Sequence, residues 1–421
     1  MKKAKDLIRN PLLLGSLLMV GGSLGNNGIN YIYHLLMGRV LGPVDYGNLA
    51  IIFSILYIVG IIPTSTSFAI VKFISSAKSK SERDHIYFTL KKLLKRFSII
   101  ASVVMLLSAY PLKNFLHLGE FYSLIFIAPI VYFMLLTIVN KALLQGILKF
   151  TGVVVSDSIS STAKLFLGIV LVFFGLKVPG ATFAIVMSSV MAYYYSEIVI
   201  KKEISEKSSL DYNIYPIIKF AFPVLLQAMA FTSIFTVDLI IIKHFFGPEN
   251  PIAGYYAALS MLGKIIFFAT QPVASVMFPI VAGKRSKGEN YRTTFYLSVS
   301  AVFLLSSLVL VFYYLLPDLA IGLLYGKDYL IVAPELVWMG LFITFYTLAS
   351  LIVNFLLSIH RTQVVMFPLV TSIVQIFVLW NVHSTIREVL YVNTILMGFT
   401  LLVLFVYLGY NELKRLNYVK T

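Results

Sequence analysis

Long apolar runs are the feature that most limits what this chain can fold into. Runs of about 20 or more apolar residues recur between Leu12 and Leu408. Backbone N–H and C=O groups find no water in the hydrocarbon core of a bilayer, so such a run crosses it as an α-helix. Charged residues make up 12% of the chain, about half the share in an average soluble domain. The sequence therefore predicts an all-α, polytopic membrane protein.

The apolar runs divide into about twelve expected transmembrane helices. Their approximate ranges are 12–37, 46–70, 97–116, 121–147, 152–176, 179–199, 215–246, 253–282, 294–316, 330–358, 363–383 and 388–410.

Basic residues set the expected orientation of these helices. Lysines and arginines concentrate in alternate connections, most densely in residues 72–96 and 284–292. Because such loops stay in the cytoplasm, we expect a multi-pass protein of the cytoplasmic membrane with both termini inside and an uncleaved first helix. This topology accounts for most of the net charge of +16. Membrane lipids are expected partners and nucleic acid is not, because the basic residues lie in short loops.

The sequence offers little for catalysis or for metal binding. It has no cysteine, its six histidines lack the spacing of metal ligands on a helix, and it contains neither a GxxxxGK nor a GxSxG motif. We therefore expect neither an enzyme nor a bound cofactor. A membrane glycosyltransferase or polymerase is also disfavoured, because every connection is short.

The two halves of the chain carry similar segments in the same order. Residues 37–82 resemble residues 241–289 in a Gly-Pro pair, a following glycine, a proline inside the next helix and a closing Ser/Lys-rich loop. The matched positions are Leu41-Gly42-Pro43 with Phe246-Gly247-Pro248, Gly47 with Gly254, and Pro63 with Pro272. A parallel repeat of this kind predicts two six-helix lobes, residues 1–205 and 206–421, and suits alternating access.

The second half opens with a more specific pattern, "VDLIIIKHFFGPENPIAGYYAA". Asp238 precedes a turn at Gly247, and Gly254 and Tyr255 open the next helix. Together with "MGRVLGPVDYG" after the first helix, this resembles the polysaccharide-type flippases of the MOP, or MATE-like, exporter superfamily. The resemblance implies two lobes around a central cavity and transport of a lipid-linked oligosaccharide, a polyprenyl-diphosphate glycan, for surface polysaccharide or glycan assembly. It also implies a glycan polymerase or glycosyltransferases of the same pathway as partners.

A MATE-type, cation-coupled antiporter of drugs or metabolites is the alternative within the same superfamily. An exporter of organic cations would favour an acidic cavity, whereas the expected spans here carry more lysines than acids. The lipid II branch of the flippases places arginines along the first helix, where this sequence has asparagines and tyrosines. This departure argues against the peptidoglycan precursor as cargo.

The first expected helix carries an unusual polar face. Asn26, Asn30 and His34 follow one another at intervals of four residues and so share one face, Asn27 flanks it, and Arg39 lies at its outer end. Such a face avoids lipid, so it either packs against a neighbouring helix through side-chain hydrogen bonds or lines a wet cavity. In the second interpretation these five residues bind the substrate, with the amides bonding sugar hydroxyls.

Ionisable residues inside the expected spans give the remaining candidates. Asp157 and Lys164 share a face of one helix, and Asp238 and Lys264 lie at similar depths in adjacent helices. The pair Asp238 and Lys264 is either a structural ion pair or part of a coupling site for Na⁺ or H⁺, and Asp157 is the second candidate for ion coupling. Lys141, Lys164 and Lys264 are candidates for binding the substrate, with Lys164 and Lys264 expected to bind its phosphates. Snorkelling is the alternative for Lys141, which lies near a helix end.

Overall fold

The computed structural model describes residues 11–204 and 212–420, except for the side chains of residues 11–14, 16, 17, 286 and 411–420. In these residues the chain forms helices and no strand, which confirms the predicted fold class. The chain divides into two compact units, Met1–Ala228 with Phe246–Asn250, and Met229–Phe245 with Pro251–Thr421. The expected lobe boundary between residues 205 and 206 lies outside the described residues and stays a prediction.

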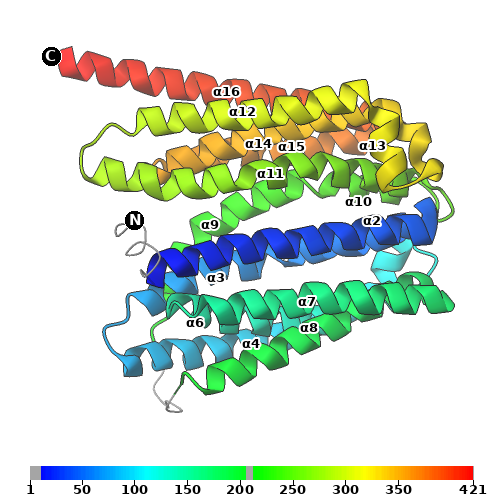
Figure 1. Ribbon diagram of the computed structural model, residues 1–421, viewed down its shortest axis with the longest axis horizontal. Coiled ribbons are helices and arrows are strands. Elements are labelled where there is room, and N and C mark those ends of the chain that lie inside the picture. Colours follow the sequence, from blue (N-terminus) through cyan, green and yellow to red (C-terminus); the bar gives the residue numbers. More distant parts are fainter. Residues whose placement is uncertain (1–10, 205–211, 421) are drawn as a thin grey trace, which may run out of the picture. The chain divides into compact units, whose positions relative to one another are not determined.

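The helices of the first unit follow one another along the chain (Figure 1). They are α2 (Pro11–Val59), α3 (Ile61–Ser75), α4 (Lys80–Phe115), α5 (Tyr122–Ile125), α6 (Ile127–Gly146), α7 (Phe150–Leu171), η1 (Val172–Leu176), α8 (Lys177–Lys201) and the first part of α9 (Tyr215–Ile234).

The second unit begins within α9. Its other elements are α10 (Val237–Phe245), α11 (Ile252–Ser286), α12 (Arg292–Leu315), α13 (Pro317–Leu324), η2 (Lys327–Glu335), α14 (Leu336–Ser358), η3 (Thr362–Val365), α15 (Met366–Asn381) and α16 (Ile386–Lys420).

Ten helical stretches of the described chain are long and apolar enough to cross a membrane. Two of them, Leu18–Ser75 and Phe150–Lys201, have 58 and 52 residues, far more than the roughly 20 that one crossing needs. The backbone breaks inside both, at Gly42 with φ +72° and at Gly175 with φ +84°. Each stretch therefore makes two crossings, in agreement with the expected total of about twelve.

The Gly-Pro repeat explains the first of these breaks. Gly42 has φ +72° and ψ 174°, a conformation that is essentially restricted to glycine. Pro43 follows directly, and its fixed φ suits the first turn of the helix that continues α2. The matched pair Gly247-Pro248 lies between α10 and α11, at the corresponding connection of the repeat.

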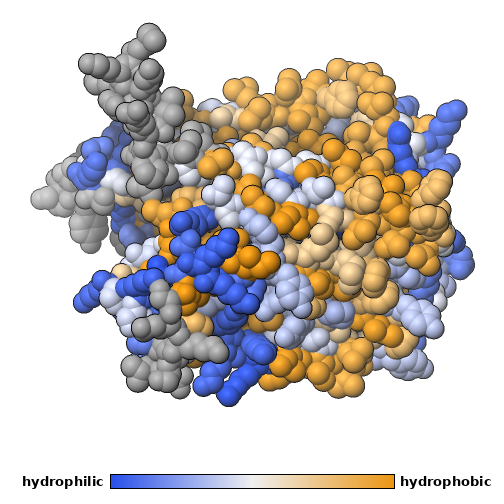
Figure 2. Space-filling view, turned by 60° about the horizontal axis from the view of Figure 1, so that its bottom comes forward, coloured by the Kyte–Doolittle hydropathy of each residue, from blue (hydrophilic) through white to orange (hydrophobic). Residues whose placement is uncertain are grey.

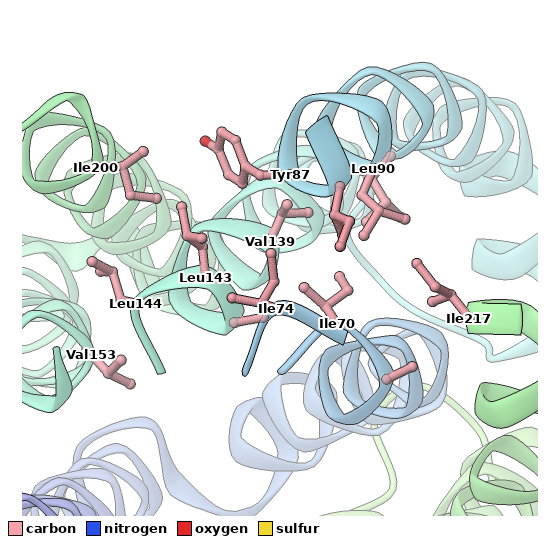
Figure 3. Packing of buried hydrophobic residues seen from close by; sticks show 14 residues of the cluster. Ile70, Ile74, Tyr87, Leu90, Val139, Leu143, Leu144, Val153, Ile200 and Ile217 are labelled. Atoms are coloured by element: carbon pink, nitrogen blue, oxygen red, sulfur yellow. The ribbon is translucent and has the colours of Figure 1, made fainter. Parts of the chain in front are cut away.

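A hydrophobic cluster holds one end of the first unit together (Figure 3). Ile74 of α3, Leu90 of α4 and Leu143 of α6 are at most 3% exposed, and Val153 of α7 and Ile200 of α8 join the same cluster. These helices approach closely: a Cβ at Gly146 would lie 2.5 Å from Cγ2 of Ile74. Small residues permit such close contacts between helices in membranes, where packing drives association.

A buried polar network crosses the same end of the first unit. The Tyr87 hydroxyl donates to Asn140 Oδ1 at 2.9 Å, and Asn140 Nδ2 donates to Ser196 Oγ at 3.0 Å and to Glu197 Oε2 at 3.1 Å. Lys91 Nζ binds both carboxylate oxygens of Glu197, at 2.6 and 2.8 Å. The network ties α4, α6 and α8 together, and buried polar groups require this kind of pairing.

In the second unit, α14 packs against α11, α12 and α16. A Cβ at Gly263 of α11 would lie 2.8 Å from Met339 Cγ of α14, and a Cβ at Gly340 of α14 would lie 3.0 Å from Leu310 Cδ2 of α12. The absence of a side chain at these two glycines therefore lets the three helices approach closely.

Candidate functional site

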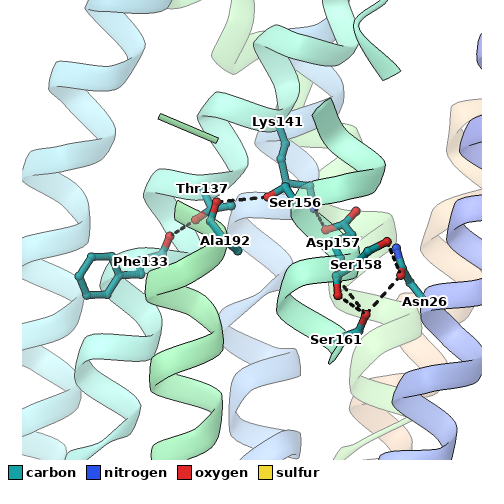
Figure 4. Close-up of polar contacts among 9 residues, drawn as sticks. All are labelled: Asn26, Phe133, Thr137, Lys141, Ser156, Asp157, Ser158, Ser161 and Ala192. Carbon is teal, nitrogen blue, oxygen red and sulfur yellow. Dashed lines mark hydrogen bonds and ion pairs between the residues drawn. The ribbon is translucent and has the colours of Figure 1, made fainter. Parts of the chain in front are cut away.

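Asn26 takes part in a hydrogen-bonded contact between α2 and α7 (Figure 4). Its Oδ1 accepts from the hydroxyls of Ser158 at 3.0 Å and Ser161 at 3.2 Å, and the side chain is 8% exposed. On the opposite side of α7, Ser156 Oγ donates to the carbonyl of Ala192 in α8 at 3.3 Å. At Asn26 the geometry fits the packing interpretation of the polar face.

Four residues further along α2, Asn30 meets Lys164 of α7. Lys164 Nζ donates to Asn30 Oδ1 at 2.6 Å, and it lies 4.8 Å from the centre of the Tyr33 ring and 5.2 Å from that of Phe53. The electron-rich faces of these rings attract the ammonium and partly replace the water that it lacks in the membrane. The structure thus brings together two residues that the sequence singled out separately. The Lys164 side chain is half-buried.

Asp157 forms an ion pair with Lys141 of α6 (Figure 4). Their side chains are 41% and 25% exposed, so the pair is in contact with its surroundings rather than enclosed. Although Asp157 shares a helix with Lys164, its charge is neutralised by a neighbouring helix. Lys141, a candidate for binding the substrate, therefore has the Asp157 carboxylate as its partner in this structure.

The other candidates on α2 lie in different surroundings. Asn27 is half-buried, and Arg39 is exposed at the end of the first segment of the helix. His34 is 5% exposed, and its ring centre lies 4.5 Å from that of Phe53 and 6.4 Å from that of Tyr46. The surroundings of the polar face therefore change along α2: Asn26 bonds serines of a neighbouring helix, whereas His34 lies among aromatic rings.

The second unit holds a separate network around Asp238 of α10. This side chain is 2% exposed, and its Oδ1 accepts from the backbone N–H of Leu239 at 2.7 Å. Its Oδ2 accepts from the Tyr256 hydroxyl of α11 and from Asn393 Nδ2 of α16, the latter at 3.1 Å. Gln375 of α15 extends the network, because its Nε2 donates to Asn393 Oδ1 at 2.9 Å. Three helices thus meet at one buried carboxylate, and a fourth, α15, joins the network through Asn393.

Lys264 of α11 lies in the same unit as Asp238. It is 7% exposed, and its Nζ lies 4.3 Å from the ring centre of Phe235. A buried ammonium and a buried carboxylate in one unit can each offset the desolvation cost of the other, so both the structural and the coupling interpretation of this pair stay open.

Two further side-chain oxygens belong to Gln375, a member of this network, and to Thr394, which follows Asn393 in the sequence. In the described part of the chain, Gln375 Oε1 and Thr394 Oγ1 are buried and have no hydrogen-bond partner. Oxygen donors, including a carboxylate, are the ligands that hard cations such as Na⁺ prefer. Asp238, Gln375 and Thr394 therefore offer oxygen atoms of the type that a small cation prefers. Within the described residues, no three His, Asp or Glu side chains lie together in a way that could hold a metal ion.

The sequence did not single out several members of these networks. Tyr256, Gln375 and Asn393 surround Asp238, and Tyr33 and the serines of α7 surround the polar face of α2. Gln375 and Asn393 are neutral amides inside apolar spans, the criterion that drew attention to Asn26, so the signal was present. Tyr33 and Tyr256 carry no comparable signal, because tyrosine is frequent in this chain.

The helical architecture and the buried ionic networks define a class, the multi-pass membrane proteins with a MATE-like fold. Over 91% of this chain and 95% of the other, the structure superposes on an inward-facing multidrug resistance MATE transporter of the MOP superfamily, with a TM-score of 0.75 and 12% identity. The inward closed lipid II flippase MurJ gives a TM-score of 0.76 and 16% identity over 93% of this chain and 87% of MurJ. An outward-facing MATE transporter gives 0.68 and 14% over 98% of both chains.

The sequence places the chain within this class. Residues 12–283 match the family described as "Polysaccharide biosynthesis protein", and the chain belongs to that family. No curated protein matches the sequence. The predicted membership of the MOP superfamily is thereby confirmed.

Proposed function

We propose that the protein is a flippase that moves a lipid-linked oligosaccharide, a polyprenyl-diphosphate glycan, across the cytoplasmic membrane by alternating access. The family match and the fold of MOP transporters support this proposal. In this proposal it catalyses no reaction, and the glycan polymerase or glycosyltransferases of the same pathway supply or use its substrate. The peptidoglycan precursor is not the proposed cargo, because α2 carries amides and tyrosines where the lipid II branch has arginines.

The single observation that carries the proposal is the position of Lys164. A substrate with a diphosphate needs a cation inside the membrane, and Lys164 is held there by an amide and two aromatic rings while it remains partly exposed. Its partner Asn30 carries an amide that can bond a sugar hydroxyl, and Asn27 is a further half-buried amide on α2. The joint phosphate site of Lys164 and Lys264 stays a prediction.

Transport is proposed to be coupled to Na⁺ or H⁺ at Asp238. A buried carboxylate that accepts bonds from a hydroxyl and an amide can exchange these donors for a cation or take up a proton. Asp157 is a weaker candidate, because the ion pair with Lys141 already neutralises it.

The alternative is a cation-coupled antiporter of drugs or metabolites, and the fold of the MATE transporters supports it. The two functions require opposite charges at the substrate site. Among the described residues of the first unit, the carboxylate of Asp157 pairs with Lys141, whereas the ammonium of Lys164 contacts an amide and aromatic rings, which are neutral.

The test uses purified protein in proteoliposomes. A fluorescent polyprenyl-diphosphate oligosaccharide is reconstituted with it, and the fraction accessible to a membrane-impermeant quencher is followed with time. We expect the wild type to flip this lipid, Lys164→Gln to flip it at least tenfold more slowly, and the matched variant Lys201→Gln at an exposed helix end to behave as wild type. Wild-type protein that leaves this lipid in place but exchanges an organic cation for Na⁺ or H⁺ would establish the antiporter instead.

A further inference from the structure

Helix α4 is longer than a membrane crossing requires. It has 36 residues, which span about 54 Å at 1.5 Å per residue, against a hydrocarbon core of about 30 Å. Between Arg96 and Lys113 it carries no charged side chain. Arg96 therefore marks the point at which α4 leaves the hydrocarbon core, and residues 80–95 extend beyond it.

One face of this extension belongs to the interior of the first unit. Leu90 and Leu94 are at most 5% exposed in the hydrophobic cluster, and Lys91 on the same face binds Glu197 of α8. The extension is therefore fixed in place by packing and by an ion pair. Because residues 80–95 are held in this way, the side chains on the opposite face of the helix keep a fixed direction relative to the first unit.

Three acidic side chains near this end of the unit have basic partners. Arg83 binds Asp84 at 2.9 Å, Lys91 binds Glu197 at 2.6 Å, and Lys149 binds Glu203 at 3.2 Å. These three carboxylates are thus neutralised by residues other than those on the outward face of α4.

The outward face of α4 carries three exposed cations, Lys92, Lys95 and Arg96. Their spacing of three and four residues places them together on the helix surface. Within the described part of the chain, neither Lys95 nor Arg96 forms a side-chain hydrogen bond or ion pair. Figure 2 shows strongly hydrophilic side chains toward the left and again at the right of the visible face, with many hydrophobic side chains between them.

The same face continues as an apolar stripe. Ile99 and Val103 follow Arg96 at intervals of three and four residues and are 47% and 48% exposed, and Leu107 is 72% exposed. Among the membrane-spanning stretches found in the described chain, the one in α4 has the smallest buried share, 17%. The three cations of α4 are thus followed, along the same face of the helix, by an exposed apolar stripe of the kind that acyl chains contact.

We propose that Lys92, Lys95 and Arg96 form a binding site for the phosphate headgroup of an anionic phospholipid, with one acyl chain along Ile99, Val103 and Leu107. In the topology expected from the sequence, this lipid lies in the cytoplasmic leaflet. The continuity of cations and apolar stripe selects a lipid over a soluble phosphate, because a free phosphate would gain nothing from the stripe. The arginine can bind a phosphate through two parallel N–H donors, and the lysines supply point charges.

The test measures lipid binding and requires no transport. Full-length protein in detergent is titrated with phosphatidylglycerol or phosphatidylcholine, and bound lipids are counted by native mass spectrometry. The wild type should prefer phosphatidylglycerol, and a triple variant K92Q/K95Q/R96Q should lose affinity for it by about fivefold per residue, from about 1 kcal/mol for each basic side chain near an anionic surface. The matched variant K201Q/K202Q removes the exposed last lysine of α8 and the exposed lysine that follows the helix, and it should keep wild-type affinity.

Three outcomes would overturn the proposal. The first is equal loss in both variants, which would mean a general effect of charge. The second is equal affinity of the wild type for the two lipids. The third is displacement of phosphatidylglycerol by inorganic phosphate at similar concentration, which would mean a phosphate site without a lipid. A photo-crosslinking residue at Ile99 gives an independent readout in protein with all three cations present, and it should capture phosphatidylglycerol in preference to phosphatidylcholine.

Discussion

The network around Asp238 makes a quantitative prediction for Asn393→Leu. Asn393 is 1% exposed and takes part in three hydrogen bonds that link α16 to three other helices. Its Nδ2 donates to Asp238 Oδ2 and to the Tyr256 hydroxyl, each at 3.1 Å, and its Oδ1 accepts from Gln375 at 2.9 Å. Leucine has a similar volume, so the substitution removes the polar contacts and leaves little cavity.

The expected loss follows from the number of bonds. In a soluble core, a buried polar group left unsatisfied costs about 1–3 kcal/mol. In membranes, hydrogen bonds between helices average about 0.6 kcal/mol, because the unfolded chain also finds partners for its polar groups. Three bonds at this smaller value give about 2 kcal/mol, which is the expected decrease in the free energy of unfolding.

The assay is reversible unfolding in mixed micelles by sodium dodecyl sulfate, followed by tryptophan fluorescence. Trp338 is a suitable reporter, because its ring packs edge-on against Tyr391 of α16 at 4.7 Å. The matched control is Ile395→Leu, at a side chain that is 69% exposed on the same helix.

A double-mutant cycle with Tyr256→Phe separates the network from packing. The two substitutions should be non-additive by about 0.6 kcal/mol, the mean value of one such bond. The reasoning is refuted if Asn393→Leu unfolds within about 0.5 kcal/mol of the control.

Three further predictions concern the first unit. Lys141→Met should destabilise the protein by about 1 kcal/mol, because it leaves Asp157 without its partner, and the further change Asp157→Asn should restore stability in the same unfolding assay. Gly42→Ala should cost about 1–3 kcal/mol, because alanine is strained at the φ of +72°. Burial, followed by the charge of Asp45, raises the pKa of Glu120, so Glu120→Gln should raise the melting temperature at pH 8 and leave it unchanged at pH 4.

The sign of the Glu120 prediction follows from proton binding. A carboxyl with a raised pKa in the folded state contributes stability while it is protonated, and this contribution is lost as the pH rises through the folded pKa. An equal shift in melting temperature at both pH values would contradict it. For Gly42, the matched control is Gly25→Ala, where a Cβ would meet no other atom, and equal effects at the two sites would contradict the strain argument. For Lys141, a double variant no more stable than the single one would contradict the ion pair.

The fold was largely predictable because hydropathy is a local property. The predicted class, the total of about twelve helices and the break at Leu41-Gly42-Pro43 follow from the order of apolar, glycine and proline residues. The helix ends differ most from prediction where a helix continues beyond the membrane, as α4 does from Lys80 instead of residue 97. Beyond the hydrocarbon core, an amphipathic helix and a loop have similar composition. Packing of α4 against α6 and the ion pair of Lys91 with Glu197 of α8 decide in favour of the helix.

The candidate sites were predictable as residues but not as contacts. The sequence selected Asn26, Asn30, Lys164 and Asp238 because polar groups are rare and costly in lipid. It did not indicate that Asn30 lies against Lys164, 134 residues away, or that Asp157 pairs with Lys141.

The sequence by itself therefore determined that this chain spans a membrane as helices, because a continuous run of about 20 apolar residues in lipid pairs its polar backbone groups within itself as a helix. Only the tertiary structure decided which polar side chains meet. Partner choice depends on how each helix is rotated and how closely it approaches its neighbours, and these are set by side-chain packing over distances that no local pattern encodes.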